Sequence, residues 1–364
     1  MGHLDWPPGC RSFFCGARQF ENNCSSRKIS TINNYIFRKL AARITVLETM
    51  PYPCQMIENF GVITNCTSRK RAVGEVVRLG RSELRGGPAK IATRWLEITG
   101  RALPVMQVGD LYIGRAMSES RAVATRLAGS LHVVSAGLGF AAKDVYVHNY
   151  DLTVVQGAGS LGGALMEAGY GPADWWRELN ALKGSPMPLS RHINQAIQTR
   201  FLIALPSVYL GMLEQDFVGL EERALDRVFI FTSRSGAGML ASRLQRCVMR
   251  YDERLQGHER FAGTRSDFPQ RAMRHFVEEL DGHHLCAERA NDAVERAMAL
   301  LKQPVVPLRV RKTDEEIIEL IRSQWMAHDG SSPRLLRYLR DKALVACEQS
   351  RFGGLWRRVR AEIQ

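Results

Sequence analysis

Four adjacent residues, His148, Asn149, Tyr150 and Asp151, combine an imidazole, an amide, an aromatic ring and a carboxylate. A carboxylate such as Asp151 can stabilise a cationic transition state or activate water, and breaking an N-glycosidic bond builds positive charge on the sugar. The amide of Asn149 could read a base edge, and the ring of Tyr150 could stack on a flipped base. We therefore predict Asp151, Asn149 and His148 as catalytic candidates, with His148 protonating the leaving base.

Each of these side chains also has an ordinary structural interpretation. An aspartate in such a position commonly caps a helix or closes a turn. A single histidine is more often structural than catalytic, and Trp95, Trp175 and Trp176 would by default fill a core rather than line a pocket. The pattern alone leaves both interpretations open for each residue.

Three predicted strand exits would supply the rest of a site. The apolar run Leu131–Val134 predicts a strand that opens into Ser135 and Gly137, and polar loops follow the predicted strands Gly61–Thr64 and Arg227–Thr232. If these strands are parallel, the exits meet at one edge of the sheet, where ligands of α/β proteins bind. Glycines and hydroxyls in such loops favour anions, so we expect a phosphate-bearing substrate. The substrate-binding candidates are Asn65, Cys66, Tyr112, Ser135, Gly137 and Tyr150, and the phosphate-binding candidates are Arg69, Lys70, Arg234 and Ser235.

The elements that must position these residues alternate between strands and helices. Helical spacing predicts helices over Val73–Leu84 and Ser118–Leu127, and Phe201–Leu205 reads as a further strand. This alternation predicts an α/β fold with a mostly parallel sheet flanked by helices. We assign residues 1–55 to an extension, 56–255 to the α/β domain and 268–364 to a helical region.

The C-terminal part has the outline of a helix-turn-helix unit. Asp314–Trp325 predicts an amphipathic helix with a capping box from Thr313 and Glu316, and further helices are predicted over Arg334–Lys342 and Ala346–Ile363. Eight basic residues against three acidic ones lie from Pro333 to the C-terminus. We predict phosphate contacts of DNA by Arg351, Arg357 and Arg358. The alternative is a small helical bundle with a solvated basic face.

The composition limits the classes of partner. The 364 residues carry a formal net charge of +13, which favours a polyanion, with nucleic acid ahead of an anionic membrane or of no partner at all. No apolar stretch is long enough for a transmembrane helix, and the first residues lack a secretion signal, so we expect a cytoplasmic protein with no membrane association. The eight cysteines form no Cys-x-x-Cys pair, so we expect reduced thiols, no metal and no cofactor.

Four segments together resemble a known family. They are Thr-Asn-Cys-Thr-Ser-Arg-Lys (64–70), Asp-Leu-Tyr-Ile-Gly-Arg-Ala (110–116), Val-Val-Ser-Ala-Gly-Leu-Gly-Phe (133–140) and Asn-Tyr-Asp-Leu-Thr (149–153). Over residues 59 to 240 the chain resembles a poorly characterised bacterial family related to the peroxide-stress protein YaaA group and, distantly, to the uracil-DNA glycosylase superfamily. One branch is similar to antiphage DNA glycosylases that act on modified phage cytosines. The Gly-x-Asp-Pro-Tyr motif of uracil-DNA glycosylases is absent, so Asp151 would act from a different loop.

The residues and the resemblance together lead to one principal hypothesis and two alternatives. The principal hypothesis is a DNA glycosylase that removes a modified base, such as glucosylated hydroxymethylcytosine of phage DNA, and leaves an abasic site in antiphage defence. We expect a monofunctional hydrolase, because no lysine is evidently set to form a Schiff base. The alternatives are a non-catalytic DNA-binding regulator and a base-exchange or deazaguanine-modification enzyme. The sequence leaves the oligomeric state open.

Overall fold

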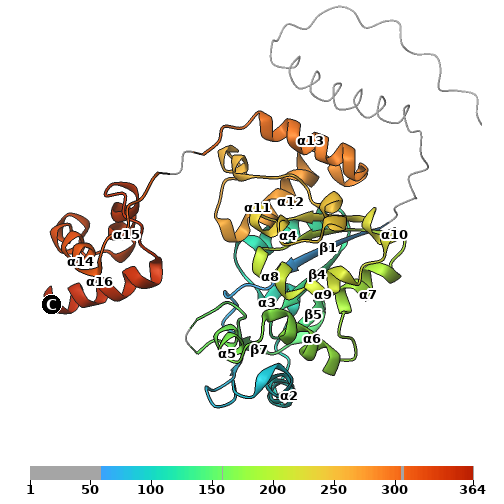
Figure 1. Ribbon diagram of the computed structural model, residues 1–364, viewed down its shortest axis with the longest axis horizontal. Coiled ribbons are helices and arrows are strands. Elements are labelled where there is room, and N and C mark those ends of the chain that lie inside the picture. The colour runs from blue at the N-terminus through green and yellow to red at the C-terminus, as the bar shows by residue number, and fades with distance from the viewer. Residues whose placement is uncertain (1–58, 158, 305–306, 364) are drawn as a thin grey trace, which may run out of the picture. The chain divides into compact units, whose positions relative to one another are not determined.

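A five-stranded sheet forms the centre of the protein (Figure 1). The computed structural model describes residues 59–157, 159–304 and 307–363, so the predicted extension 1–55 lies outside the described residues. The strands lie in the order β5 (Gly139–Ala142), β4 (Ser130–Ser135), β1 (Asn59–Asn65), β8 (Thr199–Ala204) and β9 (Val228–Phe231). All neighbouring pairs are parallel except β4 and β5, which confirms the predicted mostly parallel sheet.

The central strand β1 explains why the sheet has this arrangement. Its residues from Gly61 to Asn65 are buried, as expected for a parallel strand covered on both faces. The chain continues from β1 to β4 on one side, and the later strands β8 and β9 are added on the other side. A change of direction of this kind creates a crevice at the carboxyl ends of the strands, which is where α/β proteins bind ligands.

Helices cover both faces of the sheet (Figure 1). On one side α4 (Arg115–Arg126) packs on β1 and against α12 (Phe268–Glu278), which in turn contacts β8 and β9. On the other side α6 (Pro172–Leu182) packs against both α2 (Gly87–Thr99) and α8 (Ser207–Met212). Shorter helices complete this region: α3 (Val108–Leu111), α5 (Leu161–Glu167), α7 (Pro188–Gln195), α9 (Glu214–Val218), α10 (Glu222–Leu225) and α11 (Arg234–Ala237).

Two small strand pairs lie outside the central sheet. β2 (Val76–Arg78) pairs in parallel with β7 (Asn149–Asp151), and β3 (Met106–Gln107) pairs antiparallel with β6 (Tyr146–Val147). The helix predicted over Val73–Leu84 is therefore wrong. Gly74 adopts a positive φ of 61° just before β2, and the pairing with the distant β7 overrides the local helical spacing.

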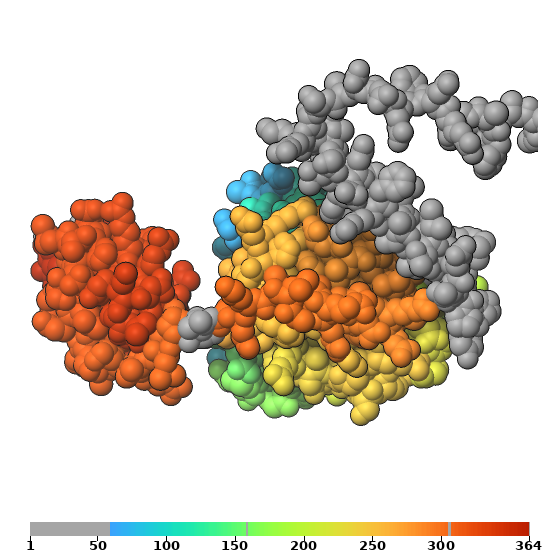
Figure 2. All heavy atoms as spheres, turned by 90° about the horizontal axis from the view of Figure 1, so that it is seen from above, coloured from blue at the N-terminus to red at the C-terminus, as the bar shows by residue number. Residues whose placement is uncertain are grey.

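The core of the α/β region includes two helices, α12 and α13, that lie beyond the domain end predicted at residue 255. The buried side chains Ala272 and Phe276 of α12, and Val294 and Met298 of α13 (Ala287–Ala299), belong to the same core as the sheet. Figure 2 shows α13, in orange, on the surface of this region. The predicted helical region 268–364 is thus divided, because residues up to about 301 complete the α/β core. Between α12 and α13 the predicted helical region is interrupted at Asp281, where φ is +46°.

The C-terminal unit consists of α14 (Asp314–Ser323), α15 (Ser332–Asp341) and α16 (Gln349–Ile363) around a separate core. Ile317, Ile321, Leu335 and Leu339 are fully buried there. The predicted capping box is confirmed, since Thr313 Oγ1 accepts from the Glu316 N–H and Glu316 Oε2 accepts from the Thr313 N–H. Within the described residues, no helix combines the length and apolar character needed to cross a bilayer.

Candidate functional site at the carboxyl edge of the sheet

The three predicted strand exits lie at one edge of the sheet, as expected. β1, β4 and β9 run parallel and end at Asn65, Ser135 and Phe231. β8 ends at the same edge and adds a fourth exit, Leu205–Tyr209, which the sequence analysis did not consider. This fourth exit lies beside β1, on the opposite side from β4, at the point where the strand order reverses.

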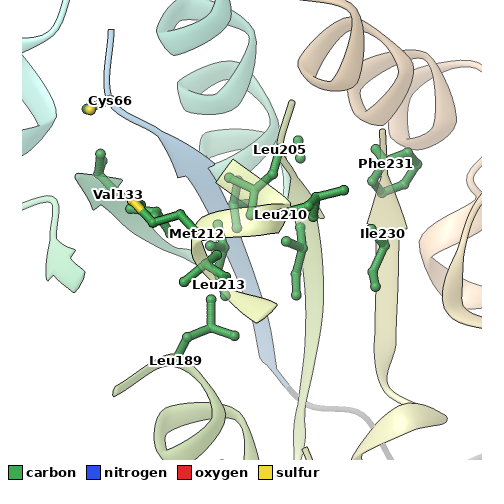
Figure 3. Packing of buried hydrophobic residues seen from close by; sticks show 14 of the residues in the cluster. Cys66, Val133, Leu189, Leu205, Leu210, Met212, Leu213, Ile230 and Phe231 are labelled. Atoms are coloured by element: carbon green, nitrogen blue, oxygen red, sulfur yellow. The ribbon is translucent and has the colours of Figure 1, made fainter. Parts of the chain in front are cut away.

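A thiol and a phenol meet at that point. Cys66 Sγ lies 3.0 Å from the hydroxyl of Tyr209, and this hydroxyl also donates to the Cys66 carbonyl at 3.2 Å. Burial raises the pKa of Tyr209, and charge on the neighbouring Cys66 raises it further, so the phenol remains a neutral donor. In Figure 3, Cys66 is labelled near the end of β1, while Leu210, Met212 and Leu213 of the α8 segment pack across the strands.

Two buried tyrosines form a second cluster beside β4. The hydroxyl of Tyr150 lies 2.6 Å from both the Tyr112 hydroxyl and Ser135 Oγ. Ser135 Oγ also accepts from the N–H groups of Gly137 and Leu138, which fixes the turn after β4. A Cβ on Gly137 would stand 2.5 Å from the Tyr150 ring, so only glycine allows this approach. The ring of Tyr150 is 1% exposed, and stacking with a flipped base would require this cluster to open.

Two tryptophans hold the turn after β4 through hydrogen bonds to its carbonyls. The indole N–H of Trp95 donates to the Gly137 carbonyl at 2.7 Å, and that of Trp175 donates to the Ala136 carbonyl at 2.8 Å. The Trp176 N–H donates to Asp216. All three rings are buried, which confirms that they fill the core. Two of them thereby hold the main chain of the candidate site in place.

Lys70 lies against the tyrosine cluster. Its Nζ lies 4.2 Å from the centroid of the Tyr150 ring and 5.8 Å from that of Tyr112. Burial lowers the pKa of Lys70, whereas the charges of Cys66 and Asp151 act in the opposite direction. The amine therefore lies against the tyrosine rings, and its charge interacts with those of Cys66 and Asp151.

Asp151 lies at the exposed rim of the site. Its side chain is 65% exposed, and Oδ2 pairs with Arg78 Nε at 3.3 Å across the β2–β7 ladder. In the free protein this carboxylate is hydrated, and its field is weaker than that of a buried group. A bound substrate would have to cover it before it could stabilise a cationic sugar. Its catalytic role stays a prediction.

The other two catalytic candidates have structural partners. Asn149 Nδ2 donates to the carbonyls of Arg71 and Val73, at 3.2 and 3.0 Å, and so holds the loop after β1. His148 is half-buried against Trp95 and Tyr150. Burial, followed by the charge of Lys183, lowers the pKa of His148, which makes a neutral imidazole and a weak proton donor near neutral pH. The Nε2 of His148 is buried without a partner among the described residues.

The predicted phosphate-binding residues differ in how free they are. Arg69, Arg234 and Ser235 are exposed at the sheet edge. Ser235 Oγ lies 2.9 Å from Ser233 Oγ, which caps α11. In the C-terminal unit Arg357 and Arg358 are exposed, whereas Arg351 is bound by Asp314 at 2.6 Å and by the Lys312 carbonyl at 2.9 Å.

Sequence reasoning missed Tyr209 and Gln270. Gln270 Nε2 reaches from α12 to Asn65 Oδ1 and to the Ala204 carbonyl, both at 2.8 Å, and ties β1 to β8. The position of Tyr209 just after the predicted strand Phe201–Leu205 was a usable signal. Nothing local marks Gln270, because its role depends on a contact across about two hundred residues.

The described residues contain no group of three or more His, Cys, Asp or Glu side chains placed to hold a metal ion. The arrangement instead offers a thiol, an amine, a carboxylate and several hydroxyl donors at one sheet edge flanked by arginines. Such a set can bind an anionic ligand and stabilise separated charges. No protein-family model, no curated protein and no solved structure matches this chain.

Proposed function

We propose that the protein is a DNA glycosylase that hydrolyses the N-glycosidic bond of a modified base at the carboxyl edge of the sheet. The observation that carries the proposal is the position of the Lys70 amine, 4.2 Å from the ring of Tyr150, which directly precedes Asp151 in β7, so that the charges of Lys70 and Asp151 interact at this edge. Interacting opposite charges suit a bond whose cleavage leaves positive charge on the sugar and negative charge on the base.

The residues divide this task by charge. Asp151 faces the sugar, where its carboxylate stabilises the developing oxocarbenium ion or orients water. Lys70 stabilises the negative charge on the departing base, and Tyr209 donates a hydrogen bond at the inner end of the site. Arg69 and Arg234 are exposed on neighbouring loops, where they can contact the flanking phosphates. The reaction is hydrolytic, and the product is an abasic site.

The substrate is modified DNA. We propose phage DNA with an enlarged pyrimidine, such as glucosylated hydroxymethylcytosine, and a role in antiphage defence in the cytoplasm. Flipping a base out of the duplex costs a few kcal/mol of stacking and pairing free energy. Hydrogen bonds from exposed donors at the rim offset part of this cost, and a base that carries extra hydrogen-bonding groups forms more of them.

A panel of normal and phage-modified DNAs tests the proposal. Each DNA is incubated with the full chain, and released bases are identified by mass spectrometry, with abasic sites counted separately by alkaline cleavage. The proposal expects one class of modified base in solution and an equal number of abasic sites. Tight DNA binding without release of any base would instead indicate a non-catalytic DNA-binding regulator.

Base exchange is a second candidate because of the position of Cys66. The Cys66 sulfur, 3.0 Å from the Tyr209 hydroxyl, could attack the sugar carbon as the base leaves with the thiol proton, and hold the sugar until another base enters. Addition of an isotope-labelled free base separates the two reactions. Hydrolysis leaves the label in solution, whereas exchange places it in the DNA, and Cys66→Ser abolishes only the exchange.

A further inference from the structure

A groove in the C-terminal unit lies between α15 and α16. It has a volume of about 520 Å³ and is lined by residues of both helices, including Ser332, Arg337 and Gly353. Its base is apolar, with Leu336 half-buried and Phe352 buried in the core of the unit. The groove is separate from the sheet-edge site, and none of the phosphate-binding residues predicted from the sequence lines it.

The walls of the groove carry an excess of positive charge. Arg309, Arg337 and Arg340 line it, against the single carboxylate of Asp341. Arg309 is held by Asp341 at 3.2 Å and by the Arg340 carbonyl at 2.8 Å. Arg340 donates twice to the Cys347 carbonyl. These two guanidinium groups are thereby fixed along one wall.

Arg337 is different, because it is exposed and makes no ion pair with any described carboxylate. Next to the lining residue Gly353, Arg357 Nη1 lies 3.8 Å from the position that a Cβ on Gly353 would take. Arg357 is also exposed and has no ion pair within residues 307–363. Two guanidinium groups without a carboxylate therefore lie at the groove, Arg337 among its lining residues and Arg357 beside Gly353.

Three other arginines of the unit are paired with carboxylates, whereas Arg311 and Arg358 are exposed like Arg337 and Arg357. Arg351 is bound by Asp314, Arg322 by Glu362 and Arg334 by Asp329. Of the arginines that an external anion can reach, Arg337 lines the groove and Arg357 lies beside its lining residue Gly353. Arginine pairs with phosphate oxygens through two parallel hydrogen bonds, and phosphate contacts position a protein on a duplex.

We propose that the α15–α16 groove binds the sugar-phosphate backbone of double-stranded DNA, with Arg337 and Arg357 contacting phosphates on its two sides. The apolar base formed by Leu336 and Phe352 faces the deoxyribose. The inference rests on the proposed function for the choice of DNA as the polyanion. It moves the phosphate contacts from Arg351 to Arg337 and keeps Arg357.

The test measures duplex affinity of the full chain by fluorescence anisotropy over a range of salt concentrations. The double variant Arg337→Gln/Arg357→Gln is expected to bind roughly tenfold more weakly at moderate salt, and its slope of log affinity against log salt is less steep by about 2. Arg334→Gln is the matched control, since it removes the same charge from α15 at a residue already paired with Asp329. Gly353→Glu leaves both arginines in place and should weaken binding by adding a negative charge to the groove.

Three outcomes overturn the inference: an unchanged salt slope in the double variant, an equal loss in Arg334→Gln, or a larger loss for single-stranded DNA or duplex RNA than for duplex DNA. Circular dichroism of each variant shows whether the helices remain folded. Base release is recorded separately. If bases are released but the groove variants bind DNA like the wild type, only the proposed role of the groove is contradicted. If the groove variants bind DNA more weakly but no base is released, only the proposed glycosylase activity is contradicted.

Discussion

The arginines of the α/β domain and those of the C-terminal unit are used in different ways. In the α/β domain Arg200, Arg227 and Arg271 are at most 3% exposed and donate to main-chain carbonyls. In the C-terminal unit Arg337, Arg357 and Arg358 stay exposed. The net charge of +13 is therefore a poor measure of the charge that a polyanion can reach. Only the partners of each guanidinium separate structural arginines from binding ones.

The largest effect expected from this comparison is in the α/β domain. Arg271 pairs with Asp267 at 2.6 Å and donates to the Thr264 carbonyl, entirely away from solvent. Arg271→Leu leaves Asp267 buried without its charge partner and should lower the free energy of unfolding by about 3–5 kcal/mol. Urea denaturation measures this loss. Arg357→Gln serves as the control, with a change of less than about 0.5 kcal/mol, and equal losses in both would break the comparison.

Lowering the pH should also destabilise the protein mainly through the α/β domain. Burial holds the pKa of His132, His275 and His283 at about 4, below the usual value of 6.5. Between these values the unfolded chain binds more protons than the folded one, so stability falls as the pH falls from about 6.5 to 4. One such histidine contributes at most about 1.4 kcal/mol per pH unit.

The variant His283→Leu tests this pH dependence. The free energy of unfolding, measured by urea denaturation between pH 4 and 7, should fall less steeply with falling pH for the variant than for the wild type. The difference in slope should correspond to at most about one proton. A stability that does not change over this range in the wild type would mean that these histidines are not neutral and buried in solution.

A smaller effect is expected in the C-terminal unit. Thr313→Ala removes the side-chain acceptor for the Glu316 N–H and should cost about 1 kcal/mol. Amide hydrogen exchange should show faster exchange in α14 and no change in the strands of the sheet. Faster exchange in both regions would indicate that the two cores do not unfold separately. Thr313→Ser keeps the acceptor and is the control.

The smallest effect concerns Arg351, which the sequence analysis placed on DNA. Its pair with Asp314 is about 40% exposed on each side, so Arg351→Gln should cost only about 0.2–1 kcal/mol of stability. Because its guanidinium is already occupied, DNA affinity and its salt slope should stay the same. A salt slope that becomes less steep by about 1 would restore the original assignment.

The sequence predicts those strands and helices that have a local pattern, such as a short apolar run or a helix-capping box. The strands β1, β4, β8 and β9 follow from short apolar runs, and α14 follows from its capping box. The helix over Val73–Leu84 was wrong because β2 is defined by its pairing with β7, which local spacing does not encode. The boundary near residue 301 depends on α12 and α13 packing on the sheet, which a helical pattern alone does not reveal.

The location of the candidate site could be predicted from the sequence, but the contacts of its individual side chains could not. Parallel strand exits place Cys66, Ser135 and Arg234 at one edge by topology alone. The partners of Asn149 could not be foreseen, because the same amide can read a base or hold a loop. The sequence suggests that the Tyr150 ring could stack on a flipped base, yet its hydroxyl is bound by Tyr112 and Ser135 in the core.

In the proposed reaction, the rim carboxylate of Asp151 at the sheet edge promotes the release of a base from DNA. The most direct test compares base release by the wild type, Asp151→Asn and Asp226→Asn on phage DNA with modified cytosines, by mass spectrometry under single-turnover conditions. Asp226 is an exposed aspartate before β9, at the opposite edge of the sheet, so it is a matched control. We predict a loss of about 10²–10³-fold in rate for Asp151→Asn, with wild-type DNA affinity and a normal rate for Asp226→Asn. Equal rates in all three proteins, or no release by the wild type, would contradict the account.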